Sequence, residues 1–226
     1  MLIGGLQKSS LVDYPSKICT VVFTIGCNFR CGYCHNPELI KKEDCISEND
    51  FFEFIKSRQG KIDAIVISGG EPTLQEDLED FIVKCRKLNF LIKLDTNGTN
   101  PEVLKNLLSK NLLDYIAMDI KAPFEKYPNI TRRFLDIEKI KKSIEIIMTS
   151  GIDYEFRTTV VRSQLNVEDL TTISENIKGA KKYYLQKFNP KEVLDEKLKN
   201  EKTYSDTEFY EIARMLEKNI EKVGVR

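Results

Sequence analysis

The stretch Gly26-Cys27-Asn28-Phe29-Arg30-Cys31-Gly32-Tyr33-Cys34-His35-Asn36 carries three cysteines with the spacing C-x3-C-x2-C. It follows an apolar, β-branched segment at 18–24 that is typical of a β-strand. Thiolates in so tight a loop are typical ligands of iron–sulfur clusters and of zinc. Three thiolates can bind three irons of a 4Fe–4S cluster and leave the fourth iron open to an outside ligand. We therefore predict that Cys27, Cys31 and Cys34 are the metal ligands and the catalytic centre.

Two other metal sites fit parts of this stretch. A structural zinc site requires a fourth ligand, and His35 is adjacent to Cys34, which makes their convergence on one ion awkward. The run Cys31-Gly-Tyr-Cys34-His35 also matches the C-x-x-C-H pattern of covalent haem attachment, but that reading leaves Cys27 unexplained. Chance burial of three cysteines does not account for the polar residues between them.

The remaining cysteines are predicted to be structural. Cys19 lies in an apolar strand and Cys85 on the apolar stripe of a helix, where cysteine behaves as a small hydrophobic residue. Cys45 precedes a helix, and its spacing from the other two is not that of a second cluster.

Composition argues against several partners. The 226 residues contain 35 Lys and Arg against 35 Asp and Glu, so the formal net charge is zero. This balance removes the usual electrostatic argument for nucleic acid or an anionic membrane. The opening residues lack the pattern of a secretory signal, and the chain has no apolar run of about 18 residues. We therefore expect a cytoplasmic protein, where clustered cysteines indicate metal binding or catalysis more often than disulfides.

Six short apolar segments alternate with helical patterns along the chain. The expected strands are 18–24, 62–67, 91–95, 115–119, 154–160 and 182–187. Helices are expected after Ser47, from 74 to 88, from 101 to 110, from 137 to 147 and from about 205 to 221, whereas 122–133 reads as a long loop. This alternation predicts one α/β domain over residues 1–226 with a parallel sheet, either open or curved into a partial barrel. Polar clusters follow the strands, so they are expected to meet at the carboxyl edge as one site.

The cysteine loop at 26–36, followed by Gly69-Gly70-Glu71-Pro72 after the second strand, resembles the radical S-adenosylmethionine superfamily. More closely, the sequence is similar to anaerobic ribonucleoside-triphosphate reductase activating proteins, which are glycyl-radical activating enzymes. The motifs that carry this likeness include Gly4-Gly5-Leu6-Gln7-Lys8, Asp13-Tyr14-Pro15, Tyr33-Cys34-His35-Asn36-Pro37, Asp95-Thr96-Asn97-Gly98 and Met118-Asp119-Ile120-Lys121-Ala122-Pro123. The resemblance implies a partial (β/α)6 barrel like an incomplete TIM barrel. It weakens after about Pro190.

The resemblance also implies roles for residues around the cluster. S-adenosylmethionine would bind the open iron through its methionine amino and carboxylate groups. Gly69 and Gly70 would leave room for a close backbone approach, and Glu71 would accept a hydrogen bond from the methionine ammonium group. Tyr33 and His35 would lie against the adenine, with His35 in a packing or hydrogen-bonding role.

The ends of the third to fifth strands are expected to complete the nucleoside site. Asp95, Thr96 and Asn97 would bind the ribose or a cation, and Asp95 with Asp119 would hold a monovalent cation beside the methionine carboxylate. Lys121 ends the fourth strand, and Arg157 on the fifth is a candidate partner for the same region. After the sixth strand, Asn189 stands where relatives place a histidine.

The function implied is an activase. Flavodoxin or ferredoxin would supply one electron, and the deoxyadenosyl radical would take a hydrogen from a glycine of a partner reductase. One alternative is a radical enzyme acting on a small molecule, such as a deazapurine-forming carboxy synthase. The other is a zinc or iron–sulfur binding module. Turnover of a free heterocycle would indicate the first, and one bound zinc the second.

Overall fold

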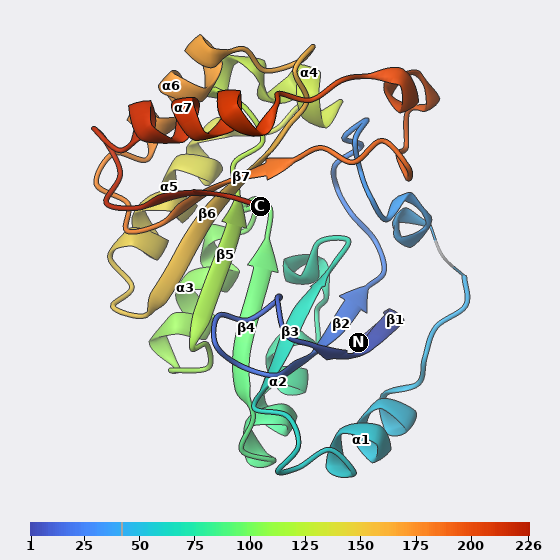
Figure 1. The fold of residues 1–226 in the computed structure, drawn as a ribbon. Helices are drawn as coiled ribbons and strands as arrows, with labels where there is room; N and C mark the ends of the chain where they lie inside the picture. The colour runs from blue at the N-terminus through green and yellow to red at the C-terminus, as the bar shows by residue number, and fades with distance from the viewer. Residues whose placement is uncertain (42) are drawn as a thin grey trace.

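Eight strands form one curved sheet in the computed structural model, which describes residues 1–41 and 43–226 (Figure 1). The strands follow one another in the sheet as they do in the chain. Strand β1 is antiparallel to β2, and every later neighbour is parallel. The strands are β1 (Ile3–Ser10), β2 (Cys19–Thr24), β3 (Ala64–Gly69), β4 (Leu91–Thr96), β5 (Tyr115–Asp119), β6 (Asp153–Val160), β7 (Tyr183–Lys187) and β8 (Val223–Val225).

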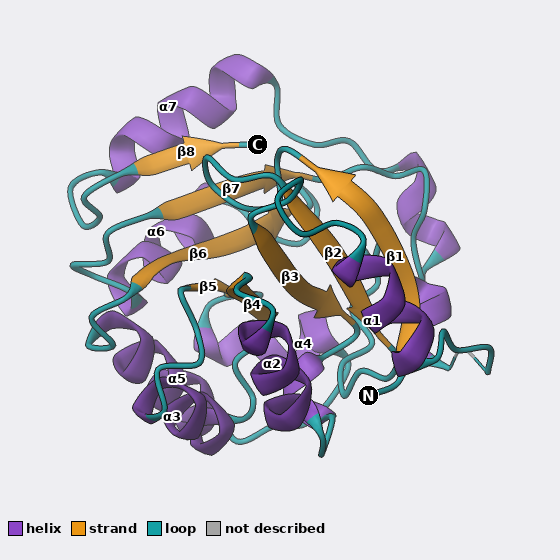
Figure 2. Cartoon of the chain, turned by 90° about the horizontal axis from the view of Figure 1, so that it is seen from below, coloured by secondary structure: helices purple, strands orange, loops and turns teal. Residues whose placement is uncertain are grey.

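Helices cover the outer, convex side of the sheet. They are α1 (Glu48–Lys56), α2 (Leu78–Lys87), α3 (Pro101–Ser109), α4 (Tyr127–Thr131), α5 (Ile137–Met148), α6 (Val167–Asn176) and α7 (Asp206–Leu216). Short 3-10 turns are η1 (Pro37–Ile40), η2 (Pro72–Leu74), η3 (Phe124–Lys126) and η4 (Glu196–Asn200). Figure 2 shows the strands as an arc with helices outside it, and β1 and β8 stand at its two ends without pairing with each other. The fold is therefore the partial barrel that the sequence predicted.

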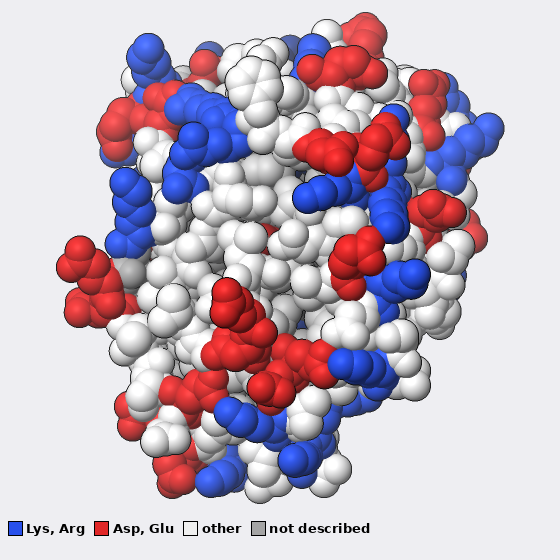
Figure 3. Space-filling model, turned by 180° about the vertical axis from the view of Figure 1, so that it is seen from behind, with Lys and Arg blue, Asp and Glu red and all other residues white. Residues whose placement is uncertain are grey.

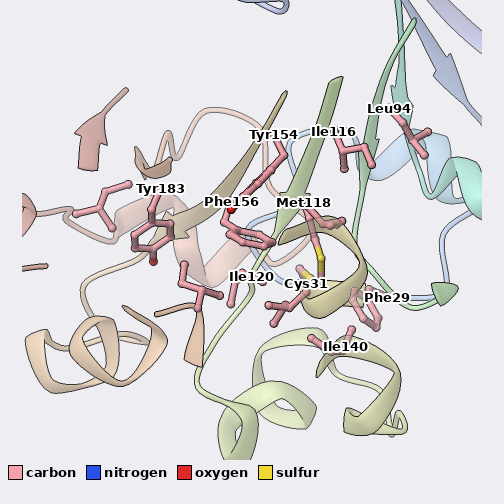
Figure 4. Packing of buried hydrophobic residues seen from close by; sticks show 14 of the residues in the cluster. Phe29, Cys31, Leu94, Ile116, Met118, Ile120, Ile140, Tyr154, Phe156 and Tyr183 are labelled. Atoms are coloured by element: carbon pink, nitrogen blue, oxygen red, sulfur yellow. The ribbon is translucent and has the colours of Figure 1, made fainter. Parts of the chain in front are cut away.

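The alternation of side chains along each strand divides the core into two parts. In β3, Ile65 and Ile67 belong to the large hydrophobic cluster that includes the buried faces of the helices. Ala64 and Val66 point the other way, into a smaller cluster on the concave face. The large cluster also contains Cys31 of the cysteine loop (Figure 4). The loop is thus anchored in the core beneath it.

The six predicted strands are confirmed, with ends shifted by two residues at most. The sequence interpretation named neither the edge strands β1 and β8 nor the helices α4 and α6. Helix α6 begins with a capping box made by Asn166 and Asp169, which is a signal the sequence did contain.

Three predicted boundaries are wrong. The segment 122–133 is not a single loop, because η3 and α4 lie within it. The last helix ends at Leu216 rather than near 221, and the chain then turns back into β8. Leu74 lies in η2 and is 42% exposed, so it does not belong to the apolar stripe of α2.

The surface is electrostatically mixed. On the face seen in Figure 3, acidic and basic side chains are interspersed around uncharged areas, in keeping with the zero net charge. No helix within residues 1–41 or 43–226 has the length and apolar character that crossing a membrane requires.

Candidate functional site

A cavity of about 260 Å³ opens at the carboxyl ends of the parallel strands. All of the site residues predicted from the sequence line it, namely Cys27, Cys31, Tyr33, Cys34, His35, Gly69, Gly70, Glu71, Asp95, Thr96, Asn97, Asp119, Lys121 and Arg157. Six further residues line the cavity without having been given a role from the sequence, namely Phe29, Asn36, Ile40, Ser68, Thr159 and Gln186. Thr159 lies two residues after Arg157 in β6, so the two-residue period of the strand already placed both on the same face. Asn189, by contrast, does not line this cavity.

The three cysteines of the loop line this cavity. Cys31 is buried, whereas Cys27 and Cys34 are partly exposed. The backbone N–H of Phe29 donates to Cys27 Sγ over 3.4 Å. Burial raises the pKa of Cys27 to about 11 and also raises the pKa of Cys31, so both are thiols until a metal displaces the proton.

Gly69, the last residue of β3, and Gly70 hold the start of this loop. Gly69 has φ +109°, and a β-carbon there would lie 2.3 Å from the backbone nitrogen of Thr24. A β-carbon on Gly70 would lie 1.9 Å from the carbonyl oxygen of Gly26, which also accepts a 2.8 Å hydrogen bond from the N–H of Glu71. The close backbone approach expected at Gly69 and Gly70 is therefore made by the chain's own backbone, at Thr24 and Gly26.

Glu71 is fully buried and accepts four hydrogen bonds from its own chain. Its Oε1 accepts from the N–H and hydroxyl of Thr73, at 3.1 and 2.5 Å, and from the hydroxyl of Thr96 at 2.7 Å. Its Oε2 accepts from the backbone N–H of Asn97 at 2.6 Å. Burial raises the pKa of Glu71, and these donors oppose the rise. Glu71 thus ties the turn after β3 to the turn after β4.

Asn97 links the same turn to the cysteine loop. Its side-chain nitrogen donates to Asn28 Oδ1 over 2.8 Å, and Asn28 donates in turn to the hydroxyl of Thr99 over 2.9 Å. The polar atoms of Thr96 and Asn97 are therefore engaged with the protein while both residues line the cavity.

Basic and acidic side chains alternate in a row of ion pairs along the wall of the cavity. Arg157 donates to Asp119 Oδ1 over 2.9 Å and to Asp95 Oδ2 over 3.1 Å. Lys93 pairs with the other oxygen of Asp95 at 2.7 Å, and Lys121 pairs with Asp119 at 3.0 Å. Burial alone would raise the pKa of Asp119, but the charges of Arg157 and Lys121 outweigh it and lower that pKa to about 2. Lys93, which is 2% exposed, was not predicted, although it shares a strand face with Asp95.

Tyr33 and His35 flank the last cysteine. The Tyr33 hydroxyl is buried and has no hydrogen-bond partner among the described residues, while the Lys121 ammonium lies 5.9 Å from its ring centroid. The ring of His35 lies 6.5 Å from that of Phe188, and burial lowers the pKa of His35. Burial thus favours the neutral form of the His35 imidazole.

The comparisons with known proteins agree with this arrangement. Residues 21–177 match the family description of the radical SAM superfamily. A protein of Methanocaldococcus jannaschii named "Putative glycyl-radical enzyme activating enzyme" is 35% identical over all of this chain and 95% of its own length. The pyruvate formate-lyase-activating enzyme of Clostridium pasteurianum is 29% identical over 83% of this chain and 82% of its own.

Solved structures show the same fold at low sequence identity. Streptococcus suis SuiB bound to S-adenosylmethionine superposes with a TM-score of 0.69 and 14% identity, over 91% of this chain and 49% of SuiB. This likeness bears on the fold alone.

The superfamily implies a 4Fe–4S cluster and S-adenosylmethionine, and the donors present fit them. Within residues 1–41 and 43–226, no three Cys, His, Asp or Glu side chains are placed to hold a single metal ion. A cluster instead offers a separate iron to each thiolate. The unpartnered hydroxyl of Tyr33 also fits a cavity that is completed by a polar ligand. The chain belongs to the radical SAM superfamily, in which it is related over its whole length to a glycyl-radical enzyme activating enzyme.

Proposed function

We propose that this chain activates a glycyl-radical enzyme and that the partner is an anaerobic ribonucleoside-triphosphate reductase. The observation that carries the proposal is the convergence of three thiols and a row of paired charges on one cavity inside an unclosed barrel. When bound and reduced, the cluster supplies the electron that cleaves S-adenosylmethionine into methionine and a 5′-deoxyadenosyl radical. A glycine Cα–H of the partner then gives up its hydrogen atom, which leaves deoxyadenosine and a glycyl radical.

In this proposal Cys27, Cys31 and Cys34 each bind one iron, and the turn at 69–71 binds the methionine end of the nucleoside. Glu71 Oε2 accepts one hydrogen bond, from the backbone N–H of Asn97, so it keeps the capacity to accept another from the methionine ammonium. Backbone carbonyl groups of the turn are the alternative acceptors. Tyr33 and His35 contact the adenine.

Asp95, Asp119, Lys121 and Arg157 form the polar wall against the ribose and the methionine carboxylate. Arg157 already bridges the two aspartates, so a monovalent cation could enter only where this guanidinium releases one of them. Because Arg157 is a fixed cation with several donors, it can do the electrostatic work that a bound cation would do.

The partner glycine reaches this wall from the open side of the barrel. Another and larger cavity, of about 690 Å³, is lined by the 11–16 turn, by side chains of β4 to β7, and by Lys222 and Arg226 on either side of β8. Arg157 and Gln186 line both cavities, so the two meet at these side chains. An extended peptide segment that enters between β1 and β8 therefore arrives directly beneath the nucleoside site.

The electron comes from a reduced flavodoxin or ferredoxin, and the reaction takes place in the reducing cytoplasm. The proposal is tested by incubating the reconstituted protein with the partner reductase, S-adenosylmethionine and reductant in the absence of oxygen. We expect a persistent glycyl doublet in the EPR spectrum. Deoxyadenosine without that doublet would overturn the activase assignment while leaving the radical chemistry intact.

A further inference from the structure

Gln186 lies where the two cavities meet. Strand β7 buries Tyr183 and Leu185 in the large hydrophobic cluster. Tyr184 and Gln186 alternate with them, and both line the larger cavity on the opposite face of the strand. Gln186 comes later in the strand and lines the cavity at the cysteine loop as well. A peptide in the larger cavity therefore meets this side chain at the boundary with the nucleoside site.

The two arginines that line the larger cavity are already paired within the chain. Arg157, which also lines the cavity at the cysteine loop, donates to Asp119 over 2.9 Å and to Asp95 over 3.1 Å. Arg226 follows β8 and donates to both carboxylate oxygens of the buried Glu155, at 2.8 and 3.0 Å. Both guanidinium charges are thus neutralised by carboxylates, so neither gives the cavity a preference for an acidic segment.

The lysines and the aspartate that line the larger cavity add no preference either. Lys93 and Lys182 each pair with an aspartate, at 2.7 and 3.7 Å. Lys222 and Asp13 carry opposite charges. The lining as a whole therefore favours neither an acidic nor a basic segment. What remains to identify the occupant is a neutral group.

The amide of Gln186 is a neutral group that can do so. Its side chain is partly exposed and forms no hydrogen bond with the residues described at 1–41 and 43–226. The amide offers an oxygen acceptor and two N–H donors. It can therefore bind a group that donates and accepts at once, without breaking a bond that the chain already makes.

A glycine is recognised through its backbone, because it has no side chain. In an extended segment the N–H and the C=O of one residue point to the same side, as they do in an antiparallel sheet. A primary amide matches this pair, since its oxygen accepts from the N–H and its nitrogen donates to the C=O. We propose that Gln186 is a positioning residue that binds the N–H and the C=O of the partner's glycine and so holds its Cα–H against the nucleoside site.

This role rests on the proposed function, because it requires the partner's glycine in the larger cavity and the nucleoside in the other. In the step that follows, the glycine Cα–H bond breaks and a C–H bond forms at the 5′-carbon, so the unpaired electron passes to the glycine. Gln186 exchanges neither a proton nor an electron. It restricts the positions of the glycine, which raises the share of encounters that lead to reaction.

The first test measures binding without any reaction. The reconstituted protein is titrated in a calorimeter, with S-adenosylmethionine and without reductant, against a peptide that spans the radical glycine of the reductase. A second peptide carries the same glycine with its nitrogen methylated, which removes the N–H. The variant is Gln186→Met, which keeps the length of the side chain and removes the amide. The matched control is Gln59→Met, at an exposed position that lines neither cavity.

We expect the wild type and Gln59→Met to bind the methylated peptide about tenfold more weakly than the unmodified one, because one hydrogen bond is lost. Gln186→Met should bind the unmodified peptide about tenfold more weakly than the wild type does, and it should bind both peptides equally. A merely structural defect would weaken the binding of both peptides alike and keep the ratio between them.

The second test follows the hydrogen atom. The reductase is prepared with glycine deuterated at Cα. The glycyl radical is measured by EPR, and the deuterium content of the deoxyadenosine by mass spectrometry. Most deoxyadenosine should carry deuterium in the wild type and in Gln59→Met, and this fraction should fall several-fold in Gln186→Met. The fraction is counted per deoxyadenosine, so a slower cleavage does not change it.

A peptide ratio that persists in Gln186→Met would overturn this role, and so would a wild type that binds the two peptides equally or binds neither. An unchanged deuterated fraction in the variant would overturn it too. In each of these cases a glycyl doublet in the wild type leaves the proposed function standing. Wild-type protein that yields deoxyadenosine with neither deuterium nor the doublet shows instead that the proposed function itself has failed.

Discussion

Gly70 lies so close to Gly26 that a β-carbon on Gly70 would be 1.9 Å from the Gly26 carbonyl oxygen. Both sides of this contact are backbone, so neither can move aside without moving a strand end. Gly70 therefore fixes where the cysteine loop begins, and the proposed nucleoside site depends on Gly70 through the loop.

The first prediction follows from this contact. Gly70→Ala should lower the free energy of unfolding by about 1–3 kcal/mol, because the added methyl group must displace the start of the cysteine loop. It should also reduce the iron content after reconstitution. Urea denaturation and iron analysis measure the two effects. Gly5→Ala is the control, since a β-carbon there has its nearest neighbour at 3.8 Å; equal losses in both variants would contradict this explanation.

Removal of one cysteine should separate cluster binding from folding. Cys31→Ala should abolish deoxyadenosine formation and lower bound iron, while the free energy of unfolding of the metal-free protein falls by only about 1–2 kcal/mol. Cys85→Ala is the matched control, because Cys85 is also buried but lies on α2 away from the cavity. It should lose similar stability and keep its iron. An iron-free Cys85→Ala protein would show that the three-cysteine assignment is incomplete.

The ion pairs of Arg157 predict a specific pH dependence. The pKa of Asp119 is lowered to about 2 in the folded protein, so its stabilising effect is present above the unfolded value near 3.8 and is lost as the pH falls toward 2. Arg157→Gln removes the main cause, and should cost about 2 kcal/mol at pH 7. The difference in the free energy of unfolding between the wild type and Arg157→Gln should become smaller below about pH 4. Urea denaturation at pH 7, 4 and 3 measures this difference. A difference that stays constant with pH would exclude the coupling between Arg157 and Asp119.

Arg157→Gln also tests how the charges of Asp95 and Asp119 are neutralised when S-adenosylmethionine binds. If Arg157 replaces a bound cation, the wild type should bind S-adenosylmethionine equally well in sodium and potassium buffers. Arg157→Gln should bind more weakly and should become sensitive to the monovalent cation. A wild-type protein that already depends on potassium would instead support the cation site predicted from the sequence.

Leu11 and Val12 test whether the partner peptide enters from the open side of the barrel. These side chains are 75% and 80% exposed and line the larger cavity, so their replacement by aspartate should not unfold the protein. The double variant should lower the yield of glycyl radical on the partner several-fold, because an apolar contact becomes charged. Deoxyadenosine formation without the partner should stay unchanged. Met215→Asp, on α7, is the control and should leave both unchanged.

The cysteine spacing, the strand pattern and the turns after the strands could be interpreted from the sequence because each is local. Three cysteines in one loop indicate a metal whatever lies around them, and apolar segments with polar ends indicate parallel strands. The residues predicted for the site, from Cys27 to Arg157, therefore line one cavity.

Other features depend on contacts between segments far apart in the chain. In β1 the polar residues 7–9 are exposed in succession, so the strand lacks the alternation of a half-buried strand. Strand β8 is only three residues long, which is too short to show a pattern. Glu71 was predicted as a ligand acceptor, but only the folded chain brings Thr96 and Asn97 to its carboxylate.

The sequence by itself determined the kind of chemistry, since thiolate ligands and glycine turns are properties of residues at fixed spacing. Tertiary structure alone decided which partners those residues have. It placed Arg157 between Asp95 and Asp119, buried Lys93 in the same row and brought Arg132 and Asp195 together over Gly32. The physical reason is that charge pairing and burial are set by distances across the fold, which separation along the chain does not specify.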